Sequence, residues 1–323
     1  MSNVAPIKSA PNPPRMSLAN VTSGRLEIPI KGLGYGPDGV GKSTWASGAP
    51  NPIWLPLDNR TSYLNIKRLP QPATWDEALE GLRLLEVEKH DFKTIVIDPV
   101  NWLEPMLAAK LTGDPLVDLT NWKSFNKGWD AAVPHWRMLV SQIERLWLLR
   151  SMNVLLLAHC KVSPFNDPQG PGYDRYEIAL HKQASGLLKQ WCDYVLFMKQ
   201  EAVGKVDSAT KRARGQETGR RLIHTTWTAA YDAKFAVSAP AELELSWTAF
   251  IEAVRAGTAR VDELTARLDA LCAELDAATA KKVRGYIADA KGDANRLDEI
   301  VNAVLLKIDE QKQAAEAAKG QST

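Results

Sequence analysis

Short apolar runs alternate with amphipathic stretches from about residue 25 to residue 256, and this alternation predicts a parallel β-sheet wrapped by helices. The most continuous runs are Thr94–Asp98 and Asn153–His159. Runs of this kind are typical of strands that are buried on both faces. Weaker runs predict further strands at 31–35, 52–57, 194–198 and 221–227.

Helices are expected between these strands, because apolar positions there recur every three to four residues. The pattern is clearest in Trp75–His90 and Val133–Arg150. A further helix is expected to begin at about Lys42, and another to span Trp247–Arg255. The sequence therefore predicts an α/β domain over residues 25–256.

The two ends of the chain differ from this domain. Residues 1–24 are rich in Pro, Ser and Asn and show no periodicity, which predicts a disordered leader. Residues 257–323 are dominated by Ala, Leu and charged residues, and their apolar positions fall at helical spacing on both sides of Gly292. We expect a small C-terminal helical hairpin or bundle, with two seams made of Val261, Leu264, Leu268, Leu271 and Leu275, then Leu297, Ile300, Val301, Val304, Leu305 and Ile308.

Composition narrows the class of protein. The 323 residues include 40 Lys and Arg against 38 Asp and Glu, so no global basic field favours nucleic acid. Three widely spaced cysteines predict neither a disulfide framework nor a zinc site. No apolar run approaches the roughly 20 residues of a membrane span, and prolines interrupt the N-terminal region where a secretory signal needs apolar residues. We therefore expect a cytoplasmic protein without a membrane partner.

A phosphate-binding loop is the strongest chemical signal in the chain. The segment GPDGVGKST matches the pattern G-x-x-x-x-G-K-[ST] and stands between a predicted strand and a predicted helix. The backbone N–H groups of such a loop wrap a polyphosphate, its lysine reaches the β- and γ-phosphates, and its hydroxyl residue binds Mg²⁺. The helix that follows adds its positive dipole end. We therefore predict that ATP and Mg²⁺ bind here, on Gly36, Pro37, Asp38, Gly39, Val40, Gly41, Lys42, Ser43 and Thr44.

Asp98 is the second anchor of this prediction. A carboxylate at the tip of a buried strand beside a phosphate loop normally holds the magnesium shell, so we expect Asp98 and Ser43 to share the ion. An aspartate that merely ends a strand in a turn, helped by Pro99, is the alternative. Because Pro99 stands where some ATPases keep a water-activating glutamate, the activating carboxylate must come from elsewhere.

Asp58 and Glu104 are the two candidates for that carboxylate. Asp58 ends the predicted second strand, and Glu104 lies six residues beyond Asp98 on the next predicted helix. A turn residue or a helix cap is the alternative for Asp58. His159 ends its own predicted strand at the edge where nucleotides bind in open α/β folds. It can sense the γ-phosphate, or it can be a histidine satisfied by neighbouring backbone.

Two predicted loops combine aromatic side chains with cations, as proteins that bind single strands do. Packing beneath a long loop, or in a subunit contact, explains the same residues. The segment 199–221 adds further cations, which a solvated hairpin tip explains as well as a phosphate track does. The DNA-binding candidates are Trp122, Lys123, Lys127 and Trp129 in the loop 110–130, and Phe165, Tyr173 and Arg175 in the loop 162–180.

These motifs resemble those of bacteriophage RecA-like P-loop ATPases, a group that includes phage AAA-type nucleotide-binding proteins and Sak-type single-strand annealing ATPases. The resemblance covers about residues 25–255. It is carried by the phosphate loop, Ile97-Asp98, 157–161, 192–195 and 231–234. It implies a RecA-like core in which Asp58 takes the place of the catalytic acid, His159 that of the γ-phosphate sensor, and Lys234 that of a lysine that reaches a neighbouring subunit's γ-phosphate. A surface lysine is the alternative for Lys234.

The same resemblance implies an ATPase of phage DNA recombination or annealing that acts as a homo-oligomer on single-stranded DNA, with a single-strand-binding protein as a further candidate partner. Asp58 replaces the usual Glu, Pro99 replaces the usual small hydroxyl residue, and Asn59-Arg60 stands where small residues are usual. These departures favour slow hydrolysis. The alternatives are a regulatory or replication-associated DNA-binding module that hydrolyses little, and a helicase-type motor.

Overall fold

The computed structural model describes Val21 and residues 28–122, 127–167, 170–206, 213–290 and 292–320. The predicted leader, apart from Val21, lies outside these ranges, and so does Lys123.

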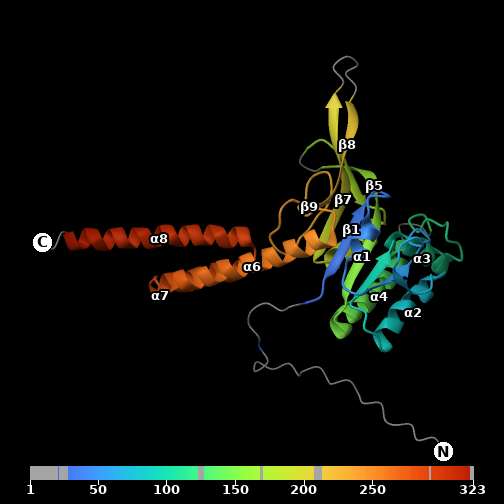
Figure 1. Cartoon of the computed structure of the whole chain (residues 1–323), viewed down its shortest axis with the longest axis horizontal. Helices are drawn as coiled ribbons and strands as arrows, with labels where there is room; N and C mark the ends of the chain where they lie inside the picture. The colour runs from blue at the N-terminus through green and yellow to red at the C-terminus, as the bar shows by residue number, and fades with distance from the viewer. Residues whose placement is uncertain are drawn as a thin grey trace, which may run out of the picture.

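A mostly parallel sheet of nine strands forms the centre of the described structure (Figure 1). Its order is β3-β2-β4-β5-β1-β7-β8-β9, and β6 pairs with β5 outside this path. Along this order, every neighbouring pair between β3 and β7 is parallel. The β7–β8 and β8–β9 pairs are antiparallel. The α/β class predicted from the sequence is confirmed. The strands are β1 (Lys31–Gly36), β2 (Pro52–Pro56), β3 (Lys67–Arg68), β4 (Thr94–Asp98), β5 (Asn153–Phe165), β6 (Tyr173–Ile178), β7 (Tyr194–Val206), β8 (Ala213–His224) and β9 (Glu242–Glu244).

Helices cover both faces of the sheet. Successive side chains of a strand point to opposite faces, so a strand made of apolar residues needs a covering layer on each side. Leu156 of β5 packs in the cluster with helices α2 (Trp75–Val87), α3 (Leu103–Thr112), α4 (Lys127–Arg150) and α5 (Lys182–Trp191). Leu155 and Leu157 pack in a second cluster with helix α1 (Lys42–Ser47) and Phe250 of helix α6 (Trp247–Cys272). The result is a three-layer domain with a core on each side of the sheet.

The strand order brings the predicted site residues to one edge. β5 lies between β1 and β4, so the strand that leads into the phosphate loop and the strand that ends in Asp98 are not adjacent. Gly36 of β1 is in register with His159 of β5, and Pro56 of β2 is in register with Asp98 of β4. Because these strands are parallel, their carboxyl ends meet at the edge where open α/β folds bind ligands.

The predicted loop over 162–180 is wrong. β5 continues past His159 to Phe165 and turns back as β6, with Cys160 opposite Ile178 and Phe165 opposite Tyr173. The segment is therefore a β-hairpin that extends from a central strand. β7 and β8 also run on beyond the predicted 194–198 and 221–227 and form a long antiparallel hairpin that projects from the domain (Figure 1).

Helix α4 begins at Lys127, upstream of the predicted start at Val133, and includes Pro134. Trp129 and Ala132 on its first turns are buried, so the helix extends its apolar face into the core before the proline. The predicted loop over 110–130 is correspondingly shorter, since α3 ends at Thr112.

The predicted C-terminal helices are present, and a break between Cys272 and Ala277 divides the first of them, which the sequence did not predict. Helices α7 (Ala277–Asp289) and α8 (Ala294–Gly320) follow α6, and Asp276 caps α7 by accepting hydrogen bonds from Ala278 and Thr279. The two predicted seams meet in one cluster, where α8 lies alongside α6 (Figure 1). The boundary expected at residues 256 and 257 falls inside α6, because this helix packs Phe250 on the α/β domain and Val261 in the C-terminal cluster.

Gly257 in α6 and Gly285 in α7 give a matched test of this packing. A Cβ at Gly257 would lie 2.2 Å from the carbonyl oxygen of Ser238, whereas nothing lies within 4 Å of a Cβ at Gly285. We expect Gly257→Ala to lower the free energy of unfolding by about 1–3 kcal/mol, because the backbone must shift. Gly285→Ala should raise it by roughly 0.5–1 kcal/mol through helix propensity. Urea unfolding followed by circular dichroism measures both, and equal effects of the two variants would contradict the close contact.

Candidate functional site

The phosphate-binding loop has the backbone that its glycines permit. Gly39 and Gly41 have φ angles of 73° and 112°, in the left-handed region that favours glycine. Gly36 lies so close to β7 that a Cβ there would stand 2.0 Å from the carbonyl oxygen of Met198. The Lys42 side chain is buried, and its Nζ donates hydrogen bonds of 2.9 Å to the carbonyl oxygens of Gly36 and Pro37. The lysine is therefore held beneath the loop, where a polyphosphate binds.

Ser43 and Asp98, the two residues predicted to share a magnesium ion, are hydrogen-bonded to each other. The Ser43 hydroxyl on the first turn of α1 donates a 2.6 Å hydrogen bond to Oδ2 of Asp98 at the tip of β4. Asp98 is 5% exposed, and burial raises the pKa of its carboxyl group, with the charge of Asp58 acting in the same direction.

This donor set fits Mg²⁺. Hydroxyl and carboxylate oxygens are the hard ligands that the ion prefers, and it usually keeps several waters and phosphate oxygens as well. Among the residues that the structure describes, no group of three His, Cys, Asp or Glu side chains could hold a metal ion by itself. The pair therefore suits an ion that arrives with a nucleotide.

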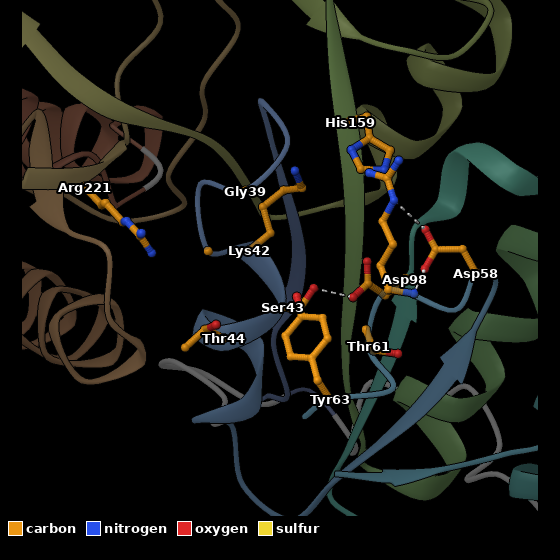
Figure 2. Close-up of a pocket in the computed structure, with 12 residues that line it drawn as sticks. Gly39, Lys42, Ser43, Thr44, Asp58, Thr61, Tyr63, Asp98, His159 and Arg221 are labelled. Carbon is orange, nitrogen blue, oxygen red and sulfur yellow. Dashed lines mark hydrogen bonds and ion pairs between the residues drawn. The ribbon is translucent and has the colours of Figure 1, made fainter. Parts of the chain in front are cut away.

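A pocket of about 260 Å³ opens over these residues. Figure 2 shows His159, Asp58 and Asp98 on one side of the phosphate loop, with Thr44 and Arg221 on the other. Charged and hydroxyl groups dominate the lining, as expected for a polyphosphate site. The lining residues are Gly39, Gly41, Lys42, Ser43, Thr44, Asp58, Arg60, Thr61, Tyr63, Asp98, His159 and Arg221.

The structure separates the two candidates for the activating carboxylate. Asp58 lines the pocket, and its Oδ1 accepts a 2.9 Å hydrogen bond from the backbone N–H of Arg60. Glu104 on α3 instead accepts a 2.8 Å hydrogen bond from the backbone N–H of His181, at the start of α5. Burial raises the pKa of Glu104. Glu104 is therefore a positioning residue between two helices, and only Asp58 of this pair faces the pocket.

His159 is fixed at the pocket by a residue that the sequence analysis missed. Asn101, in the 3₁₀ turn Val100–Trp102, accepts a 2.6 Å hydrogen bond from the backbone N–H of His159 and donates one of 2.6 Å to the carbonyl oxygen of Ala179. The His159 ring is left to face the pocket and Asp38. Burial lowers the pKa of this histidine, and so does the charge of Lys42.

Two of the predicted DNA contacts are wrong. Trp129 is 2% exposed and stacks on the His181 ring at a centroid distance of 3.6 Å, so it has no free face for a base. Arg175 is 7% exposed and pairs with Asp232 at 2.6 Å, which leaves it unsuited to a phosphate track. In both cases the packing alternative stated above is the correct one.

The other predicted DNA residues keep accessible surface or lie outside the described residues. Phe165 and Tyr173 are half-buried neighbours on the β5–β6 hairpin, with ring centroids 5.3 Å apart. Lys127 is exposed at the start of α4, and Trp122 packs partly against the core. Lys123 lies outside the residues that the structure describes.

Lys234 is not brought to the pocket of its own subunit. It pairs with Val195 at the start of β7, and its Nζ donates a 2.5 Å hydrogen bond to the carbonyl oxygen of Cys192. This is the amino end of the strand, whereas the phosphate loop leaves the carboxyl end of β1. A contact of Lys234 with a neighbouring subunit stays a prediction.

The pocket lining includes four residues that were not predicted there, Arg60, Thr61, Tyr63 and Arg221. Arg60 follows Asp58 by two residues, a spacing that points to a turn as readily as to a site. Tyr63 is 81% exposed, and Arg221 belongs to β8, far away in sequence. The closeness of Arg60 to Asp58 in the sequence was the one signal that could have placed Arg60 at the pocket. Arg221 could be placed there only once the strand order was known.

The fold and the site together are those of the P-loop class of nucleotide-binding proteins. Residues 28–236, well over half of the chain, match the AAA domain family, and the chain belongs to this family of P-loop ATPases. A search among curated proteins finds no match. Within the described residues, no helix is both long and apolar enough to traverse a membrane.

Proposed function

We propose that this protein binds ATP together with Mg²⁺ and hydrolyses it to ADP and phosphate. The observation that carries the proposal is the 2.6 Å hydrogen bond between Ser43 and Asp98 beside a phosphate loop with a buried lysine. Hydroxyl, carboxylate and ammonium groups converge there at the carboxyl edge of the sheet. The metal, when bound, would neutralise charge on the phosphate oxygens.

The roles of the side chains follow from their positions. Lys42 exchanges its two carbonyl acceptors for phosphate oxygens, which are stronger partners because they are charged. Asp58 accepts a proton from a water that attacks the γ-phosphorus, while the bond to the bridging oxygen of the leaving ADP breaks. His159 contacts the γ-phosphate from β5, where this strand passes the pocket.

Lys42→Ala tests the phosphate loop. We expect the affinity for Mg·ATP to fall roughly 10- to 100-fold, since a hydrogen bond from a charged donor is lost. Lys281→Ala removes the same group from the exposed face of α7 and serves as the control. Isothermal titration calorimetry measures both variants. Undiminished affinity of Lys42→Ala, or ATP turnover that persists after chelation of Mg²⁺, would contradict the proposal.

Asp58→Asn tests the activating carboxylate. Turnover should fall on the order of 10²-fold or more, the usual contribution of a general base, while ATP affinity stays close to that of the wild type. Glu104→Gln is the matched control, because it neutralises the competing carboxylate outside the pocket. A steady-state phosphate-release assay, corrected for folded protein, compares them. Loss of turnover in Glu104→Gln but not in Asp58→Asn would reverse the assignment.

We further propose that single-stranded DNA is the partner and that the protein acts on it as a homo-oligomer in recombination or annealing. One feature supports this. β5 carries His159 at the pocket and continues for six residues to Phe165 on the hairpin. At about 3.3 Å per residue, a rigid strand spans the roughly 20 Å from the nucleotide to the aromatic pair. A γ-phosphate sensor and a base-stacking surface on one strand would couple ATP to DNA.

A DNA-binding module with little hydrolysis is the second candidate. It is supported by the backbone N–H of Arg60, which donates a hydrogen bond to Oδ1 of Asp58 and so occupies one of the two oxygens that could accept a proton from water. The DNA-stimulated turnover measured below separates the two candidates, because a regulatory module would bind DNA without a gain in turnover.

Phe165→Ala tests the DNA surface. Loss of one stacking partner should weaken single-strand binding by about 1–3 kcal/mol and reduce DNA-stimulated ATP turnover. Tyr286→Ala, which removes an aromatic ring that is 59% exposed on α7, is the control. Fluorescence anisotropy with a labelled oligonucleotide at low salt measures binding, since electrostatic attraction is strongest there. Absence of any binding by the wild type with ATP present would refute DNA as the partner.

A further inference from the structure

The carboxylate of Asp38, inside the phosphate loop, is held between two residues of the pocket. Arg60 Nη1 lies 3.0 Å from Asp38 Oδ2, and His159 Nδ1 faces Asp38 Oδ1. Arg60 follows the end of β2, and His159 lies on β5. Three separate segments at the carboxyl edge of the sheet therefore converge on one side-chain anion.

The charges around Asp38 favour its ionised form. Burial acts to raise its pKa, but the hydrogen bond from Arg60 and the charges of His159, Arg60 and Lys42 prevail and lower the pKa of Asp38 below its usual range. Arg60 and His159 both line the pocket that the phosphate loop forms. The two groups best placed to receive a phosphate at this end of the pocket already hold an anion.

We propose that Asp38 is an internal competitor for the terminal phosphate of the nucleotide. Its carboxylate occupies the anion position between Arg60 and His159, and the γ-phosphate takes that position when a triphosphate binds. This inference rests on the proposed function, since it concerns the same pocket. It assigns Arg60 as a γ-phosphate ligand supplied by the same subunit.

Displacement is easy because the pair is exposed. The side chains of Asp38 and Arg60 are each 62% exposed, and ion pairs in water contribute little to stability. A γ-phosphate brings more charge and more acceptor oxygens than a carboxylate, so it is the stronger partner for a guanidinium. A diphosphate ends one phosphate short and leaves the Asp38–Arg60 pair in place. The pair therefore discriminates ATP from ADP.

The exchange also acts on Asp58. Arg60 Nε lies 3.8 Å from Asp58 Oδ2, besides the backbone hydrogen bond to Oδ1. When the guanidinium turns to the phosphate, Asp58 Oδ2 loses its ion-pair partner and is free to accept a hydrogen bond from a water molecule. Binding of the terminal phosphate thus frees Asp58 to hold the water that attacks the γ-phosphorus.

Calorimetry of four proteins tests the proposal: the wild type, Asp38→Asn, Arg60→Ala and the double variant. Each is titrated with ADP and with a non-hydrolysable ATP analogue in the presence of Mg²⁺. Asp38→Asn should bind the analogue about two- to fivefold more tightly, the worth of one exposed ion pair, with ADP affinity unchanged. Arg60→Ala should bind the analogue about tenfold more weakly, again with ADP unchanged. In the double variant Arg60 is absent, so Asp38 and the γ-phosphate compete for His159 alone. The gain in analogue affinity from Asp38→Asn should therefore shrink.

The outcomes separate this proposal from the proposed function. If the wild type binds neither nucleotide, the assignment of the pocket fails. If it binds both, but Asp38→Asn leaves analogue affinity unchanged or lower, or tightens ADP equally, Asp38 is no competitor. An equal gain with and without Arg60 means simple charge repulsion and also overturns the proposal. Asp76→Asn, which breaks the exposed pair with Lys110 on helices α2 and α3, controls for the loss of one charge.

Discussion

The hydrogen bond between Ser43 and Asp98 is the constraint on which the site depends. It joins the first turn of α1 to the tip of β4, two segments 55 residues apart in sequence and separated in the sheet by β5. Asp98 is nearly fully buried, and an ionised carboxylate in such a place is costly unless it is hydrogen-bonded or paired. The phosphate loop is thereby tied to a carboxylate that can complete a metal site, and β5 is held between the two segments with His159 at the pocket.

Charge balance explains the rest of the pocket. Asp98 and Asp58 raise the local negative charge, while the buried Lys42 and the exposed Arg60 oppose it. Burial lowers the pKa of Lys42, and the carboxylates of Asp38 and Asp98 counteract that effect. A polyphosphate with a magnesium ion would relieve both imbalances at once, because the metal would compensate the acids and the phosphates would compensate the lysine. The geometry is therefore already arranged for the charge distribution of the bound nucleotide.

Much of the fold and part of the site could be predicted from the sequence. Buried parallel strands such as Thr94–Asp98 are continuous apolar runs, and the phosphate loop has a fixed spacing, so their places were correct. The β5–β6 hairpin was missed because its strands beyond His159 are largely polar, because β5 contains Pro164, and because Gly170 and Gly172 stand between the strands, all of which indicate a loop. Trp129 and Arg175 were misassigned because composition does not show which way a side chain points. Trp129 lies on the buried face of α4, and Arg175 is bound to Asp232, whose approach depends on tertiary packing.

The first arms of both projecting hairpins are neighbours of β1, the strand that leads into the phosphate loop. β1 pairs with β5 on one side and with β7 on the other, and each of these strands continues outward as the first arm of a hairpin. Gly36 is packed so closely on the carbonyl of Met198 in β7 that this part of the loop cannot shift without moving that strand. A Cβ at Gly41 would stand 3.2 Å from Nη1 of Arg221 in β8, and Gly36 is in register with His159 of β5. A shift of the loop at Gly36 therefore acts on the first arms of both hairpins, since backbone packing connects Gly36 to β7 and strand pairing connects it to β5.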